Sequence, residues 1–108
     1  MSSRVLVGTA ALLIATVSHA AAGCDDASMQ QYRQVAGIVD SLHPQKPGQM
    51  RVFAADGSEF NAGQASWMKA RLRKYEQLCA HGSPQELAEA AKILAEVQDL
   101  VKSHQRQS

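Results

Sequence analysis

Two cysteines constrain the fold of this chain more than any other feature of its sequence. Cys24 and Cys79 are its only cysteines, and they lie 55 positions apart. An even number of cysteines in a short exported chain is typical of disulfide bonding, and two cysteines allow one intramolecular pair. In the loop-entropy account, closing a loop of this length stabilises a fold by about 4 kcal/mol. We therefore predict a Cys24–Cys79 disulfide.

The first residues predict that the chain is exported. Arg4 precedes the uncharged run VLVGTAALLIATV, residues 5–17, and the small residues of SHAAAG follow. A membrane-spanning helix needs about 20 apolar residues, so this run is too short, and the alanines suit a signal peptidase. We predict a cleaved secretory signal peptide over residues 1–22, a single helical domain over residues 23–104 and a frayed tail over residues 105–108. The mature protein would then be periplasmic or secreted.

A second interpretation makes Cys24 the lipid-bearing first residue of a lipoprotein. The stretch AAGC, residues 21–24, supplies the small residues and the cysteine that lipidation requires. Against it, Ala21 stands where such signals usually carry a larger aliphatic residue. A lipidated Cys24 would also leave Cys79 as a lone thiol in an oxidising compartment. The disulfide is the preferred interpretation, and the lipid anchor is the alternative.

Apolar residues recur at steps of three and four in three segments, which predicts three amphipathic helices. These segments are residues 25–42, 61–82 and 83–104. The first ends at HPQKPG, because Pro44 disfavours helical backbone at the residue before it. The other two begin with the capping sequences NAGQ and SPQE, in which a cap residue pairs with a Gln or Glu three positions later.

The segment between the first two helices, residues 50–61, has two interpretations. Asp56-Gly57 is a favoured two-residue turn, which indicates a small β-hairpin. A lone two-stranded ribbon is marginal, and the alanines in this segment are poor strand formers. An ordered loop pinned by Phe53 and Phe60 therefore fits equally well, and the sequence leaves the choice open.

Three amphipathic helices with short or medium links predict an all-α fold, a small three-helix up-down-up bundle. Antiparallel packing of the first two helices would bring the start of one beside the end of the other. Cys24 and Cys79 lie at those two positions. The helical pattern and the cysteine spacing therefore favour the same geometry.

The second helix and the segment before it hold the residues that we expect to bind a partner. KARLRK, residues 69–74, places four basic side chains on one helix, and aromatic residues lie nearby. Aromatic and arginine side chains are typical of interface hot spots. The candidate partner-binding residues are Phe53, Phe60, Trp67, Lys69, Arg71, Arg73 and Lys74.

Each part of this candidate surface also has a plainer interpretation, which is the preferred one for each group taken alone. The basic side chains would form a solvated helix face that acidic residues of the third helix balance, namely Glu86, Glu89, Glu96 and Asp99. The two phenylalanines would fold their segment back over a thin, alanine-rich core.

Neither a metal site nor an enzyme is expected. His43, His81 and His104 each lie near a predicted helix end, where an imidazole interacts with exposed carbonyl groups, and in the expected bundle the three could not converge. No phosphate loop, nucleophile elbow or metalloprotease motif occurs in the sequence. Ser41, with Asp40 and His43 nearby, sits at a helix end where such residues act as caps. We expect no cofactor.

Charge narrows the class of partner. The chain has 11 basic and 10 acidic residues, and loss of Arg4 with the signal would leave a formally neutral protein, which argues against nucleic acid. We expect a non-catalytic module that binds a protein of the cell envelope, of the inhibitor, immunity or adaptor type. The first alternative is a lipid-anchored envelope component whose basic helix faces membrane or wall polymer. The second is a periplasmic metal-handling protein.

Overall fold

The computed structural model describes residues 23–107, so the predicted signal segment, residues 1–22, lies outside the described residues, as does Ser108. Within this range the chain forms helix α2 (Asp26–Asp40), strands β1 (Arg51–Phe53) and β2 (Glu59–Asn61), and helices α3 (Ala62–His81) and α4 (Pro84–Gln107). The described part of the chain is mostly helical and contains one disulfide, Cys24–Cys79. The predicted helical class and the predicted disulfide are confirmed.

Capping side chains set the starts of the helices. Asp25 caps α2 by accepting the Ser28 backbone N–H at its Oδ1, with a donor–acceptor distance of 2.7 Å. Asn61 and Gln64 form a reciprocal capping box on α3, as the sequence predicts. Each of these contacts satisfies an amide that has no partner inside its helix.

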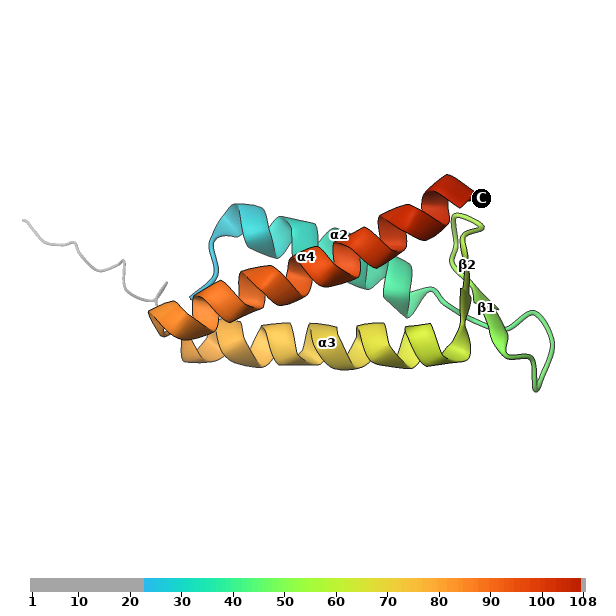
Figure 1. The fold of residues 1–108 in the computed structure, drawn as a ribbon, viewed down its shortest axis with the longest axis horizontal. Coiled ribbons are helices and arrows are strands. Elements are labelled where there is room, and N and C mark those ends of the chain that lie inside the picture. The colour runs from blue at the N-terminus through green and yellow to red at the C-terminus, as the bar shows by residue number, and fades with distance from the viewer. Residues whose placement is uncertain (1–22, 108) are drawn as a thin grey trace, which may run out of the picture.

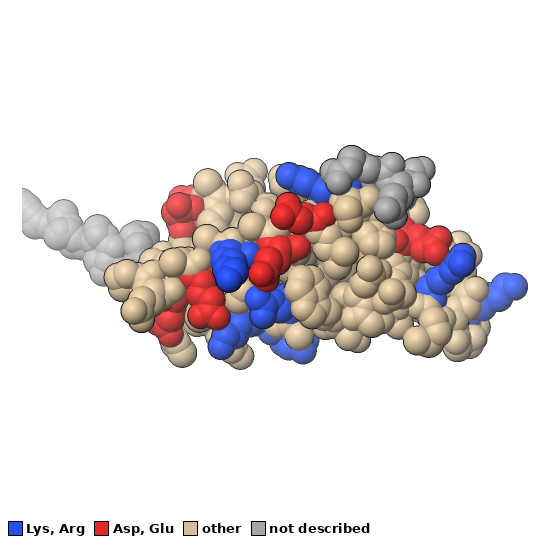
Figure 2. All heavy atoms as spheres, in the orientation of Figure 1, with Lys and Arg blue, Asp and Glu red and all other residues tan. Residues whose placement is uncertain are grey.

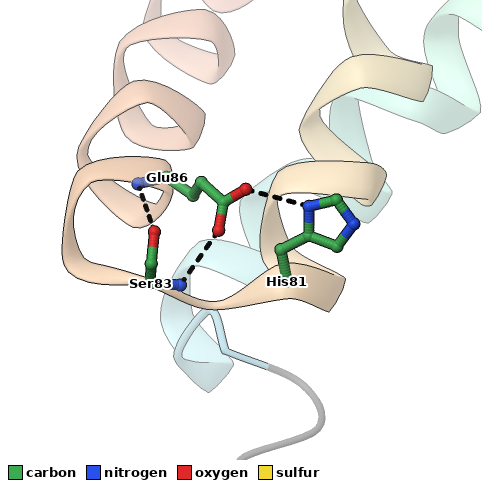
Figure 3. Close-up of polar contacts among 3 residues, drawn as sticks. All are labelled: His81, Ser83 and Glu86. Carbon is green, nitrogen blue, oxygen red and sulfur yellow. Dashed lines mark hydrogen bonds and ion pairs between the residues drawn. The ribbon is translucent and has the colours of Figure 1, made fainter.

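The turn between α3 and α4 combines a left-handed glycine with a second capping box. Gly82 ends α3 at φ 75°, a conformation that favours glycine. Ser83 Oγ accepts the Glu86 N–H at 3.2 Å, and the Glu86 carboxylate accepts the Ser83 N–H at 3.3 Å. The same carboxylate lies 2.9 Å from His81 Nδ1, so the end of α3 and the start of α4 share one polar cluster (Figure 3).

Residues 51–61 form an antiparallel hairpin, which decides between the two interpretations of this segment. Its register pairs Val52 with Phe60, and both side chains are buried. The turn is longer than the two residues expected, because the Ala54 N–H donates to the Ser58 carbonyl across it. Gly57 has φ 92°, the left-handed conformation that a three-residue hairpin loop requires.

The hairpin is not an isolated ribbon. The backbone of His43 exchanges two hydrogen bonds with Phe53, so the link after α2 pairs with β1. Phe60 from β2 joins the core, where it is 2% exposed. These contacts supply the additional packing that a lone two-stranded ribbon lacks.

Consecutive helices run in opposite directions along the molecule, and the hairpin lies at the end where α2 and α4 finish (Figure 1). Each helix contacts the other two. The apolar core has one cluster toward the hairpin, built around Val39, Phe60, Met68 and Val97. A second cluster toward the disulfide contains Tyr75, Cys79, Ile93 and Leu94. None of the described helices has the length and apolar character that crossing a membrane requires.

Helix α4 continues to Gln107, beyond the expected end near His104. The hairpin gives the physical reason. Gln105 Nε2 donates to Asp56 Oδ2 at 2.9 Å, and the His104 ring stacks on Phe60 with centroids 4.5 Å apart. Contacts to a segment distant in sequence therefore hold a helix end that was expected to fray.

The disulfide joins the residue before the N-cap of α2 to the last turn of α3. Gly23 packs against the same turn at φ 60°, and a Cβ at this position would lie 2.2 Å from the Cys79 carbonyl oxygen. Only glycine fits this close approach, because any side chain would collide with backbone.

Replacing both cysteines by alanine should lower the free energy of unfolding by about 2–5 kcal/mol, because the unfolded chain regains the entropy of an open loop. Urea denaturation of the oxidised protein and the double variant measures the difference. An unchanged denaturation midpoint would contradict the prediction, as would unreduced peptides that lack the Cys24–Cys79 cross-link.

Candidate interaction surface on helix α3

The structure separates the three aromatic residues that the sequence placed in one candidate surface. Phe60 is 2% exposed and lies in the core, and Phe53 is half-buried beside it in the hairpin. Trp67, on the second turn of α3, is 41% exposed. Phe60 therefore has no surface to offer a partner, and Trp67 has.

Arg71 connects Trp67 to helix α4. The guanidinium carbon lies 5.8 Å from the centre of the Trp67 ring, within the range of a cation–π contact. Arg71 Nη2 also donates to Glu96 Oε1 at 2.7 Å. With both contacts made, Arg71 holds the indole in place and is itself paired with an acidic residue of α4.

Lys69 and Arg73 lie on the opposite side of α3, at a groove that α3 forms with α2. The groove has a volume of about 280 Å³, and Ala36, Val39 and Leu72 are among its apolar lining residues. Glu76 also lines it, and the Tyr32 hydroxyl donates to the Glu76 carboxylate. The four basic residues of the sequence cluster thus divide between two sides of one helix.

Helix α3 is the basic element of the described chain. It carries four Lys and Arg side chains and a single acidic one, Glu76. Lys69, Arg73 and Lys74 are exposed and have no acidic partner among the described residues. Figure 2 shows basic side chains gathered over α3, with acidic side chains beside them over α4. The expected balancing by α4 is observed at one of the four basic residues, Arg71.

Sequence reasoning missed the contacts of His104. Its Nδ1 donates to the Glu59 carbonyl at 2.7 Å, and its Nε2 lies 3.3 Å from Gln64 Nε2. The ring therefore joins α4 to β2 and to the first turn of α3. Beside it is a cavity of about 570 Å³ whose lining includes Arg51, Glu59 and Asn61. Position at a helix end predicted only local carbonyl contacts, and the observed partners lie about 40 or more residues away.

Two carboxylates have lowered pKa values because they accept hydrogen bonds. The Ser58 hydroxyl, the Ser58 amide and the Gln105 side chain lower the pKa of Asp56 at the hairpin turn. Ser83 and then His81 lower the pKa of Glu86 at the start of α4. Both groups stabilise turns rather than mark a reactive centre, because each bonds to neighbouring amides and side chains in a turn.

The other residues considered for chemistry have structural contacts. Ser41 Oγ donates to the Ile38 carbonyl and accepts the Ala55 N–H, and the His43 ring contacts the Ser41 carbonyl rather than its hydroxyl. Among the described residues, no three His, Cys, Asp or Glu side chains group closely enough to hold a metal ion.

Comparison with known proteins identifies no relative of this chain. No protein-family model matches the chain, and no curated protein or solved structure matches it either.

His104→Ala should lower the free energy of unfolding by about 1–2 kcal/mol, because it removes a ring contact and leaves the Glu59 carbonyl without its donor. Amide hydrogen exchange should accelerate in β1 and β2 more than in the middle of α3. Lys102→Ala, at an exposed position of α4, is the control. Equal exchange rates in the two variants would show that His104 does not hold the hairpin.

Acid should destabilise the protein through Asp56 and Glu86. A carboxyl whose folded pKa lies below its unfolded value contributes stability above the unfolded pKa, about 4, and loses it as the pH falls through the folded pKa. Asp56→Asn or Glu86→Gln should therefore reduce the loss of stability between pH 7 and pH 3, measured by urea denaturation. Glu89→Gln, which removes the same charge at an exposed position of α4, is the matched control. A loss equally large in all variants would contradict the assignment.

Proposed function

We propose that this protein is an exported, non-catalytic binding module, periplasmic or secreted, whose helices form an up-down-up bundle that presents the outer face of α3 to a protein of the cell envelope. An inhibitor, immunity or adaptor role fits a small domain of this kind. The observation that carries the proposal is Trp67, a large aromatic side chain that is 41% exposed and is held by Arg71. Lys74, on the same side of α3, is exposed and has no acidic partner among the described residues.

Exposing the large side chain of Trp67 to water costs free energy, and the packing of the core gives no reason for that exposure. Met68, Leu72 and Tyr75 supply the buried face of α3, and each is at most 5% exposed. Trp67 thus lies outside the stripe that folding needs. Tryptophan and arginine are the residues that most often dominate the binding energy of an interface.

The contacts of Cys24 favour a released protein over a lipid-anchored one. A lipid thioether would use the same sulfur that bonds to Cys79, so the two fates of Cys24 exclude each other. The exported location rests on the sequence of residues 1–22 and on a disulfide that suits an oxidising compartment. We do not extend the proposal to metal handling, because no side-chain group within the described part of the chain favours it.

Capture of partners from an envelope extract tests the proposal. The bait is the protein purified after export, compared with Trp67→Ala and with Lys102→Ala as the matched exposed control. Trp67→Ala should weaken capture of a specific protein by about 2 kcal/mol or more, which is about thirtyfold in dissociation constant. The melting temperature should stay nearly constant, because Trp67 is not a core residue.

The two failures have different meanings. Should Trp67→Ala unfold the protein, the indole contributes to the fold and the proposed surface is wrong. Should the variant fold and capture the same proteins equally well, binding uses another face. Arg71→Glu is unsuitable for this test, because it would place a second carboxylate beside Glu96 and disturb folding and binding together.

A further inference from the structure

We propose that the partner of the α3 surface is an acidic polypeptide segment, and that Lys69, Arg73 and Lys74 bind its carboxylates while Trp67 and the α2–α3 groove bind its apolar side chains. This inference rests on the proposed function and names the chemistry of its partner. The exposed residues concerned are called the basic strip: Trp67, Lys69, Arg73 and Lys74.

Unpaired charge on the basic strip is the first argument. The two other charged residues of α3 are already engaged, since Arg71 pairs with Glu96 and Glu76 accepts from Tyr32. The three remaining cations are exposed and lack an acidic partner among the described residues. An acidic partner that lies across the exposed surface of α3 complements these three positive charges, and a basic partner is repelled.

Spacing and shape supply the second argument. Lys69 and Arg73 are one helical turn apart, so their side chains lie side by side on the wall of the α2–α3 groove. The groove lining includes the apolar residues Ala36, Val39 and Leu72, and its volume of about 280 Å³ accommodates an apolar side chain. Asp40 and Glu76 also line this groove, and their negative charges disfavour a carboxylate of the partner there. We therefore place the carboxylates of the partner segment over α3 and one of its apolar side chains in the groove.

A polypeptide fits this surface better than a membrane does. A helix that lies on a membrane turns a continuous apolar face toward the lipid. The apolar face of α3 is buried against the core, and the large exposed apolar residues of the described chain are Met50 and Trp67. One exposed indole on a helix with four basic side chains provides little for insertion, whereas it suits an interface in which charges pair at the rim.

The chain contains a single tryptophan, so fluorescence of Trp67 reports directly on this surface. The purified mature protein is titrated with three synthetic peptides of equal length that place Glu, Gln or Lys between leucines, and with phosphatidylglycerol vesicles. The Glu peptide should change the Trp67 emission, and its affinity should fall as the salt concentration rises. Equal binding of the Glu and Gln peptides would overturn the proposal, as would a response to the vesicles without one to the Glu peptide.

Charge reversal locates the site. Lys69→Glu/Arg73→Glu should weaken binding of the Glu peptide about tenfold or more and should allow the Lys peptide to bind. The matched control is Lys92→Glu/Lys102→Glu, which changes the same charge at exposed positions of α4 and should alter binding by less than about threefold. An equal loss in the control would show that net charge alone, and not the basic strip, governs binding. Circular dichroism verifies folding, and Lys69→Gln/Arg73→Gln replaces the first variant if that variant unfolds.

Failure here and failure of the proposed function are distinguishable. If a captured protein depends on Trp67 but the Glu peptide does not bind, α3 is an interface and the acidic class of partner is wrong. If the Glu peptide binds while capture is independent of Trp67, the strip binds carboxylates but is not the surface that the partner uses.

Discussion

The covalent bond between Cys24 and Cys79 fixes the start of α2 against the end of α3, and the packing of the rest depends on that attachment. Helix α2 has only two buried residues, Val35 and Val39, so its apolar contacts alone provide a small area of burial. The loop closed by the disulfide contains α2, the hairpin and nearly all of α3. Helix α4 then packs on this closed unit through Ala90, Ile93, Leu94, Val97 and Val101.

The hairpin completes the other end of the molecule. Phe60 closes the core there, and His104 and Gln105 of α4 bind the strand and the turn from outside. Both ends of α3 are thus held, one by the disulfide and one by the hairpin. A helix fixed in this way presents its outer side chains in a constant arrangement, which lowers the entropy lost when a partner binds.

Helix α3 has two faces with different physical roles. Its inner residues are buried, with Tyr75 and Met68 at 0% exposure, and its exposed residues include three basic side chains and one indole. The Arg71–Glu96 pair neutralises one charge and leaves three without an acidic partner among residues 23–107, so the positive field of α3 is reduced but not removed. The proposed binding surface follows from this incomplete pairing more than from the number of basic residues.

Much of the fold could be predicted because its signals are local. The caps at Asp25, Asn61 and Ser83, the glycine at position 82 and the apolar periodicity depend on residues within a few positions of one another. The candidate site was only partly predictable. The sequence named Trp67 and the basic residues, yet it could not separate them from Phe60, because exposure depends on which elements pack together.

Local sequence therefore determined the three helices, and composition and spacing determined the single disulfide. Only the tertiary structure decided that residues 51–61 form a hairpin, since a short ribbon needs partners such as His43 and the core to become stable. It also decided which basic residues are paired, because Glu96 reaches Arg71 only when α4 packs on α3. Contacts between residues far apart in the chain are not encoded in any short segment, and they decide which side chains remain on the surface to bind a partner.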